Sequence, residues 1–331
     1  RLSPERIGWL YVNIPSFVDW LGLATEAATS PIKSEGQSAN FIFASLQAAS
    51  TGLVGETAIA PAPGQVFQRT DVIEEKTAIS ANLSLLPPEA PFASVGTNLD
   101  QTLQSLNGAV GGYRFAQQAI ATFWQSLSLN LDAPAVAKLP SLPGPYVLAW
   151  LPKPTPTWLL ITENQSSQAL VALDEWGMAQ GLNVSQVPLG DRSITAWTRF
   201  ALNRNRAALK LDTQVVGVHA AVPGHEVFAT SLAGLERVLN RSTSDPSAEP
   251  SDDSWLSSSL APKQGAVTYV NWPVLAPTLT QQFAWLRILD AAGRPLTSHI
   301  GPITINFREE DSSDHGFLKR GEVVIKLVET T

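Results

Sequence analysis

Residues 2–15 read LSPERIGWLYVNIP, and residues 260–273 read LAPKQGAVTYVNWP. The two segments align without a gap, so the chain carries an internal repeat near its two ends. In each copy a Pro-containing segment leads into β-prone residues, which are followed by an Asn and then by a Pro. A looser copy, LLPPEAPFASVGTNL, spans residues 85–99 and is the second of the three in chain order. The identical pairs between the first and third copies are Leu2/Leu260, Pro4/Pro262, Tyr11/Tyr269, Val12/Val270, Asn13/Asn271 and Pro15/Pro273.

The conserved position of Asn within the repeat predicts a strand that passes directly into a helix. Asn13, Asn98 and Asn271 each stand where an N-cap belongs, because an Asn side chain can accept from the first free backbone N–H groups of a helix. Pro15 and Pro273 follow within the first turn, where a missing N–H costs nothing. We therefore interpret these Asn residues as helix caps rather than as ligand groups.

Each copy continues with helical and then strand-like sequence. Residues 41–49 and 113–127 predict a second helix in the first and second copies. Two-strand hairpins are predicted to follow in all three copies. Their strands are 52–60 with 65–72, 145–151 with 157–162, and 300–307 with 316–328.

The segment between the second and third copies differs from them. It predicts a helix over 168–181 that ends at a C′ glycine, Gly181, and a second helix over 231–239 capped by Ser231. Strands are predicted at 193–200, 214–221 and 225–230, the last after a Pro223–Gly224 turn. Residues 241–254 are rich in Ser, Asp and Pro and predict a mobile surface loop.

The predicted fold class is α+β, with antiparallel sheets and helices packed on one face, built from repeated strand–helix–helix–hairpin units. Residues 86–331 contain one complete set of elements and are expected to form one α+β domain. Residues 1–85 resemble the closing part of a preceding unit. We therefore expect the parent protein to extend upstream of Arg1 and to carry any export signal or membrane anchor there.

Composition excludes several classes of function. Hydrophobic residues make up 44% of the 331 residues, which is enough for a large core, and the net charge is −7. That acidity argues against nucleic acid as a partner, since a sequence-independent binder needs clustered Lys and Arg. The chain has no Cys, which excludes disulfides and thiolate chemistry. No apolar run approaches the ~20 residues that span a bilayer.

The strand and turn signatures resemble a known family. They are Leu86-Pro87-Pro88 with Val95-Gly96-Thr97-Asn98-Leu99, then Leu129-Asn130-Leu131-Asp132, then the run from Leu142 to Ala149. This pattern is similar to an uncharacterised family of cyanobacterial, membrane-anchored, extracytoplasmic proteins described only as a domain of unknown function. The resemblance implies a location in the periplasm or thylakoid lumen and attachment to a membrane. It implies no catalytic residue and no cofactor.

Motifs for chemistry are weak. Ser30 and Lys33 match the Ser-x-x-Lys of penicillin-binding proteins, and Lys76 and the Ser80–Asn82 segment echo the companion motifs, but their order is wrong. The acidic residues 309–314 form no alternating calcium-loop pattern. None of the four His residues pairs at helical spacing with another His or with a carboxylate on a predicted helix, so structural roles are expected. We predict no catalytic residue, no metal site and no cofactor.

The chain contains ten Trp residues, most of which are expected in the core. Trp255, beside a polar segment, and Trp272, just after Asn271, are the candidate exposed ones and mark a possible interface. The leading hypothesis is a non-catalytic, membrane-tethered protein acting by protein–protein contacts in the assembly or maintenance of a membrane complex. The alternatives are a carrier or sensor of an apolar ligand such as a lipid or pigment, and a serine hydrolase-like enzyme based on Ser30.

Overall fold

The computed structural model describes a mostly β chain, and all statements below concern its described residues. These are 6–13, 16, 39–50, 52–61, 82–99, 102, 144–153, 155–163, 167–205, 208–243, 266–282, 287, 291, 297–312 and 316–328. The strands are β1 Arg6–Asn13, β2 Ala39–Ala49, β3 Gly52–Pro61, β4 Phe92–Gly96, β5 Tyr146–Leu151, β6 Thr157–Glu163, β7 Asn183–Leu189, β8 Arg192–Asn205, β9 Ala208–Val222, β10 His225–Ala229, β11 Ala266–Asn271, β12 Ile300–Ser312 and β13 Gly316–Leu327. The longer helices are α7 Ser167–Ala179, α8 Leu232–Thr243 and α10 Trp272–Gln282.

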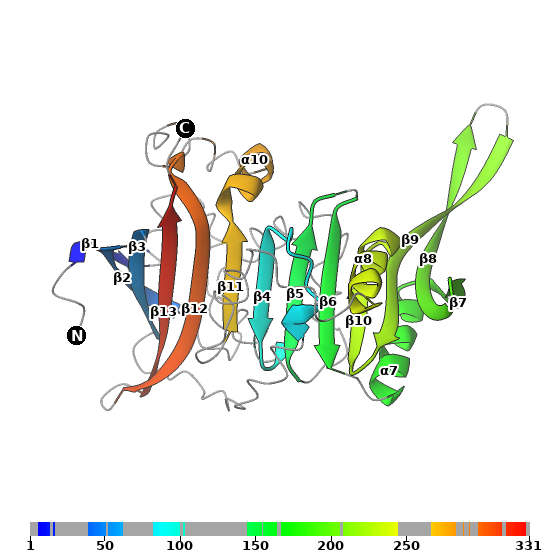
Figure 1. Ribbon diagram of the computed structural model, residues 1–331, viewed down its shortest axis with the longest axis horizontal. Helices are drawn as coiled ribbons and strands as arrows, with labels where there is room; N and C mark the ends of the chain where they lie inside the picture. Colours follow the sequence, from blue (N-terminus) through cyan, green and yellow to red (C-terminus); the bar gives the residue numbers. More distant parts are fainter. Residues whose placement is uncertain are drawn as a thin grey trace.

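The strands form one open sheet. Its order is β1-β2-β3-β13-β12-β11-β4-β5-β6-β10-β9-β8-β7, and 13 strands take part (Figure 1). All neighbouring strands run antiparallel. The strands β1, β4 and β11 are each joined to the hairpin that follows them in the chain. Within the described ranges, β1 and β7 are the two edges of the sheet.

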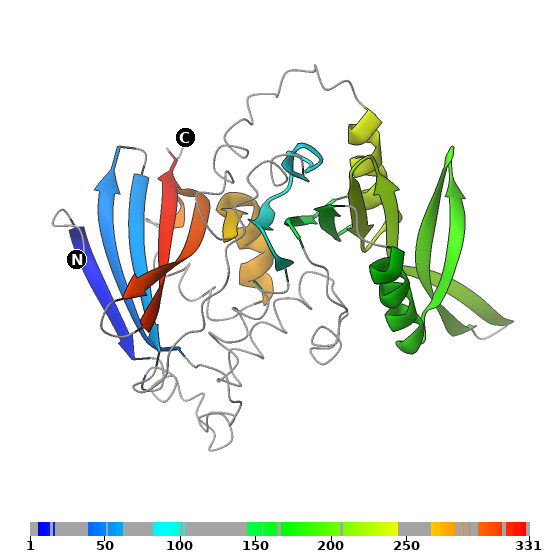
Figure 2. The same ribbon diagram turned by 90° about the horizontal axis from the view of Figure 1, so that it is seen from below.

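Apolar side chains cover both faces of the sheet. The larger core lies on the face that carries Val95, Val147 and Tyr269, and α8 packs there through Leu235 and Val238. A smaller cluster lies on the opposite face, where α10 covers the central strands; it consists of Trp150, Trp158, Leu275 and Leu279, with Phe92, Leu148, Val270 and Trp272 at its border. The two helices α7 and α8 also lie on opposite sides of the sheet, as the turned view shows (Figure 2).

This architecture corrects part of the predicted fold class. The prediction of antiparallel sheet is confirmed, but the chain forms one sheet and is mostly β rather than α+β. Helices pack on both faces of the sheet rather than on one. The prediction was wrong because strand residues with apolar side chains on both faces lack clear alternation and resemble helical sequence.

The segment 41–49 is the clearest error. It lies in β2 and not in a helix. Phe41, Ile42 and Phe43 have high strand propensity, whereas the Ala residues that follow favour a helix. Pairing with β1 on one side and β3 on the other overrides the helical preference. Gly52 begins β3 with φ +143°, a conformation that favours glycine and closes the tight β2–β3 connection.

Several local predictions are confirmed. The hairpins β5–β6 and β12–β13 form where they were expected. The helix α7 ends before Gly181, which has φ +78° as a C′ glycine requires. The backbone N–H of Gly234 donates to Oγ of Ser231 at 3.2 Å, which makes Ser231 the N-cap of α8. Oδ1 of Asn13 accepts from the backbone N–H of Ser16 at 3.0 Å, the contact expected of an N-cap, and residues 17–38 after it lie outside the described ones.

Other predictions fall partly or wholly outside the described residues. The strand at 65–72 and the helix at 113–127 lie outside them. Of the predicted mobile segment 241–254, residues 241–243 form the end of α8, and the remainder is not described.

The predicted boundary at residue 85 does not divide the sheet. Strand β3, from the first segment, pairs with β13, from the second, so that Val54 lies opposite Val324. Both segments therefore contribute to one continuous sheet, and the division into 1–85 and 86–331 stays a prediction. No helix within the described ranges is long and apolar enough to cross a membrane.

Candidate functional site

The edge strand β1 and its neighbour β2 carry an exposed group of large apolar side chains. We call Ile7, Trp9, Tyr11 and Phe43 the aromatic edge surface. Trp9 is 70% exposed and Ile7 64%, while Tyr11 and Phe43 are each about two-fifths exposed, at 43% and 41%. Trp9, Tyr11 and Phe43 share one face, because Tyr11 lies opposite Phe43 and side chains two residues apart point the same way. Ile7 precedes them at an irregularity of the β1–β2 register between Arg6 and Gly8. Leu10, 58% exposed, points to the other face.

The aromatic rings of this surface hold one another in place. The Tyr11 ring stacks on Phe41 with 5.7 Å between centroids and lies 4.9 Å from Phe43. Such cross-strand aromatic pairs stabilise the β1–β2 pairing and fix the ring positions. The surface therefore combines an ordered geometry with apolar chemistry that water solvates poorly.

The aromatic edge surface lies on the same sheet face as the main core. Strand register carries that face from Tyr269 through Thr304 and Val324 to Val54. At the centre of the sheet this face is buried beneath α8 and the segment 82–90. At β1 and β2 the same face presents its apolar side chains to solvent.

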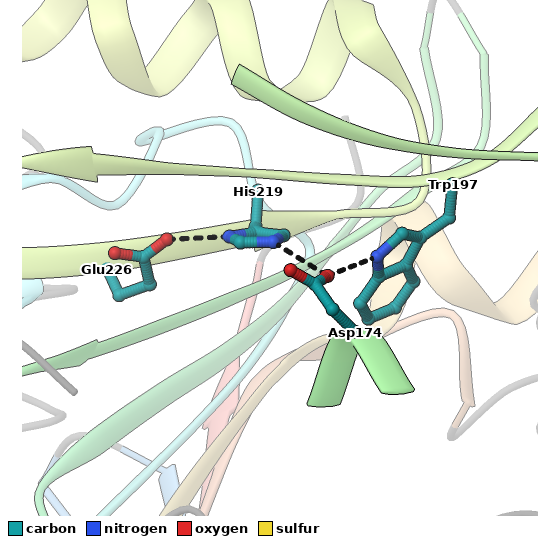
Figure 3. Close-up of polar contacts among 4 residues, drawn as sticks. All are labelled: Asp174, Trp197, His219 and Glu226. Atoms are coloured by element: carbon teal, nitrogen blue, oxygen red, sulfur yellow. Dashed lines mark hydrogen bonds and ion pairs between the residues drawn. The ribbon is translucent and has the colours of Figure 1, made fainter. Parts of the chain in front are cut away.

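A second candidate site is a buried ionisable group near the opposite end of the sheet. We call Asp174, Trp197, His219 and Glu226 the histidine cluster (Figure 3). Nδ1 of His219 lies 2.8 Å from Oε1 of Glu226, and Nε2 lies 3.2 Å from Oδ1 of Asp174. The indole N–H of Trp197 donates to the same Asp174 oxygen at 2.8 Å. The cluster thereby ties α7, through Asp174, to strands β8, β9 and β10.

Gly217 allows the close approach that this geometry needs. A Cβ on Gly217 in β9 would lie 2.9 Å from Cε3 of Trp197, closer than side chains tolerate. A Cβ on Gly177 in α7 would lie 3.6 Å from Cε2 of the same ring, which is an ordinary van der Waals distance. The Trp197 ring also lies 5.9 Å from His219 between centroids. The indole is therefore packed between helix and sheet, with its N–H directed at Asp174.

The surroundings favour a charged His219. Burial lowers the pKa of His219, but the hydrogen bond to Glu226 and the charges of Asp174 and Glu226 outweigh burial, so the pKa is raised. His219 is 5% exposed and Glu226 3%. A buried charge of either sign is costly unless paired, and here each buried charge has a partner.

This arrangement is suited to holding structure rather than to chemistry. Both ring nitrogens of His219 face carboxylates, so neither offers a free lone pair to a substrate proton. The carboxylates lie on opposite sides of the ring and do not converge on a point where an ion could bind (Figure 3). Within the described part of the chain, no group of three or more His, Asp or Glu side chains could hold a metal ion.

Of the two predicted interface residues, the structure describes Trp272, which lies away from the aromatic edge surface. Trp272 is the first residue of α10 and packs, partly buried, against the smaller core cluster of Trp150 and Trp158. Trp255 lies outside the described residues. The role of both in an interface stays a prediction.

The residues of the hydrolase alternative give little support to a site. Ser30, Lys33, Lys76 and Ser80 lie outside the described residues. Asn82 is fully buried, and its side-chain amide donates to the backbone carbonyl of Pro145 at 3.1 Å. That contact joins two segments of the chain and gives Asn82 a structural role.

Sequence reasoning missed both sites. For the histidine cluster a signal existed, since the Pro223–Gly224 turn fixes the β9–β10 register and brings His219 diagonal to Glu226. For the aromatic edge surface the signal was the run from Ile7 to Asn13, which has apolar residues on both faces and no charge. Edge strands usually carry charges or Pro, so their absence marks an unprotected edge.

Comparison with known proteins gives one result. The chain matches, over residues 1–327, a family described as protein of unknown function (DUF3352). No curated protein and no solved structure matches the chain significantly. The match covers nearly the whole sequence and agrees with the resemblance to a family known only as a domain of unknown function. The chain belongs to the DUF3352 family.

Proposed function

We propose that this chain is a non-catalytic, extracytoplasmic, membrane-tethered protein that acts through protein–protein contacts, and that the aromatic edge surface makes those contacts. Its role is the assembly or maintenance of a membrane complex. The observation that carries the proposal is the exposure of Trp9 and Tyr11 on β1, which pairs with β2 on one side and has no strand partner on the other within the described residues. Tyr and Trp are enriched in the energetically dominant parts of interfaces, because they bury large area at low entropic cost.

Physical chemistry supports a binding role for this surface. Single exposed apolar residues are ordinary, but a group of large exposed apolar side chains in which ring contacts order Tyr11 and Phe43 is typical of an interaction site. The aromatic contacts of Tyr11 order the surface before a partner arrives, which reduces the entropy lost on binding. Strand β1 carries a single charged residue, Arg6, which favours an apolar rather than an electrostatic contact.

The histidine cluster supports the non-catalytic part of the proposal. Both nitrogens of its imidazole are engaged by carboxylates. The cluster does not combine a nucleophile, a free base and an oxyanion site. Its contacts instead fasten α7 to the sheet.

The compartment is part of the same proposal. A cysteine-free chain of 331 residues is compatible with a location outside the cytoplasm. The family resemblance supplies the periplasm or thylakoid lumen, a membrane tether and a cyanobacterial source. Fractionation of source cells, with the full-length protein followed by antibody, tests the compartment and the tether directly.

The contact role is tested by native electrophoresis of mildly solubilised source membranes. The full-length protein should migrate with a large complex, and the double variant Trp9→Ser/Tyr11→Ser should migrate alone. The matched control is Val187→Ser, which removes an exposed apolar side chain from the opposite edge strand β7 and should leave migration unchanged. Migration of the unaltered protein as a free monomer contradicts the proposal, as does a double variant that stays in the complex.

A further inference from the structure

We infer that the free edge of β1 pairs antiparallel with β1 of a second copy of this chain, with Leu10 at the two-fold axis. The inference rests on the proposed function, because it takes β1 as a contact surface. It names the partner of the strand edge, whereas the aromatic side chains on the adjoining face remain available for the membrane complex.

The edge itself is open and unprotected. Within the described ranges β1 pairs only with β2, so its other side presents free backbone N–H and C=O groups. From Ile7 to Asn13 the strand contains no charged residue and no Pro, the usual devices against edge-to-edge pairing. Pairing with an identical strand therefore places no like charges opposite each other in this stretch.

The sequence repeat indicates which kind of strand pairs with the free edge of β1. By the alignment of 2–15 with 260–273, β1 corresponds to β11, and Trp9, Leu10 and Tyr11 correspond to Val267, Thr268 and Tyr269. On one side, β11 pairs with β12, the first strand of the hairpin that follows it, just as β1 pairs with β2. On its other side, which corresponds to the free edge of β1, β11 pairs antiparallel with β4.

Strand β4 belongs to the second copy of the repeat, residues 85–99. Residues 86–96 align without a gap with residues 2–12, and Leu86, Pro88 and Glu89 match Leu2, Pro4 and Glu5. This alignment places Ser94 at the position of Leu10. It also places Ala93 and Val95, which point into the main core, at the positions of Trp9 and Tyr11, which lie on the same face of the sheet.

The β4–β11 pair then has a symmetric register. Thr268 lies opposite Ser94, and their hydroxyls are 3.1 Å apart. Both residues align with Leu10, so two residues at the Leu10 position of the repeat lie opposite each other. Val267 lies opposite Val95 and Tyr269 opposite Ala93, so the position of Trp9 faces that of Tyr11. Two related strands within one chain thus already form the pair that two β1 strands would form between chains.

Transferred to β1, this register specifies the interface. Leu10 faces Leu10 of the other copy, and Trp9 faces Tyr11 on the aromatic side. The two-fold axis is perpendicular to the sheet, so the sheets of the two copies join into one and their aromatic edge surfaces lie on the same face. Antiparallel pairing of identical strands is isologous, which closes the assembly at two copies.

Disulfide trapping tests the register, since the chain has no Cys of its own. In Leu10→Cys the two Cα atoms would be about 4.5–5.5 Å apart, within the range that a disulfide spans. The control is Gly8→Cys, on the same face, where an added Cβ meets nothing within 4 Å. Its counterpart would lie four residues along the strand, roughly 13 Å away, too far for a bond. Under mild oxidation Leu10→Cys should give a covalent dimer and Gly8→Cys should not.

The mass of the unmodified chain tests the association itself. Light scattering after size exclusion at micromolar concentration should give twice the 35.5 kDa of the chain. Leu10→Lys places two like charges at the axis and should give the monomer mass. Leu10→Thr introduces the residue type that β11 has at the corresponding position, and this variant should remain dimeric. Equal circular dichroism spectra and unfolding midpoints for both variants show that folding is unaffected.

Three results would overturn the inference: a monomer mass for the unmodified chain, a Leu10→Lys variant that stays dimeric, or trapping through Gly8→Cys but not Leu10→Cys. A monomeric chain that still requires Trp9 and Tyr11 to migrate with the membrane complex overturns this inference and leaves the proposed function standing. A dimer whose double Ser variant still migrates with the complex overturns the proposed function and leaves this inference standing.

Discussion

His219 and Glu226 are joined at 2.8 Å by a hydrogen bond that runs diagonally across two neighbouring strands. His219 lies opposite Phe228 in the register, and Glu226 lies opposite Ala221. The pair is almost completely buried, so its energy depends on the protonation of the imidazole more than that of an exposed pair would. This gives the fold a titratable contact on the face that α7 covers.

The stability of the protein should therefore depend on pH through His219. Because the folded-state pKa is raised above the ordinary 6.5, the stabilisation is complete below pH 6.5 and is lost as the pH rises through the folded-state value. The free energy of unfolding should thus fall on going from mildly acidic to alkaline pH. Urea unfolding followed by Trp fluorescence at a series of pH values measures this slope.

The control for this slope is His219→Gln/Glu226→Gln, which keeps a hydrogen-bonding pair of similar shape but cannot titrate. Its unfolding free energy should vary less over the same pH range, and the difference between the two curves isolates the histidine. Identical slopes for the two proteins would refute the role of His219 as the titrating group.

Removing one partner of the cluster should cost more than removing two. His219→Leu leaves the buried Glu226 carboxylate without its cation, and such a change costs about 3–5 kcal/mol. His219→Leu/Glu226→Leu removes both charges and fills the space with apolar groups, so it should cost less than the single substitution. A double-mutant cycle by urea unfolding measures the coupling. Additive costs would show that the two groups do not interact.

The sequence contains most of the strands but not their assembly. Hairpins were predictable where a turn signal is flanked by β-prone residues, as at Pro223–Gly224. Residues 41–49 were misassigned because Ala-rich sequence favours a helix until β1 and β3 pair with it. Nothing local indicates that β3 meets β13, since that contact joins segments far apart in the chain. One continuous sheet was therefore not predictable from element signals alone.

The candidate sites differ in the same respect. The proximity of His219 to Glu226 follows from hairpin register and could have been derived from sequence. The contribution of Asp174 depends on where α7 docks, which no local pattern specifies. The exposure of Trp9 depends on β1 being an edge strand, which is a property of the whole sheet. In each case the sequence showed which side chains were present, but it did not show where α7 and β1 lie in the folded sheet.

The packing of Trp197 makes Gly217 a position that should tolerate no side chain. Gly217→Ala forces the indole to move, because the new Cβ would lie 2.9 Å from Cε3, and overpacking of this kind costs about 1–3 kcal/mol. The near-ultraviolet circular dichroism should change as the ring shifts away from Asp174. Gly8→Ala is the matched control, since its Cβ meets nothing within 4 Å. Equal stability of the two variants would contradict the packing argument.

Fluorescence quenching should distinguish the exposed Trp9 from the buried Trp150. Trp9 is 70% exposed, whereas Trp150 is 3% exposed and its indole N–H has no hydrogen-bond partner within the described residues. Trp9→Phe should remove an acrylamide-accessible emitter and lower the overall quenching slope, whereas Trp150→Phe removes a shielded one and should raise it. Both substitutions keep an aromatic ring, so the β1–β2 surface and the smaller core cluster retain their packing. If Trp9→Phe left the slope unchanged, Trp9 would be covered in solution, and the aromatic edge surface could not be the free contact site on which the proposed function depends.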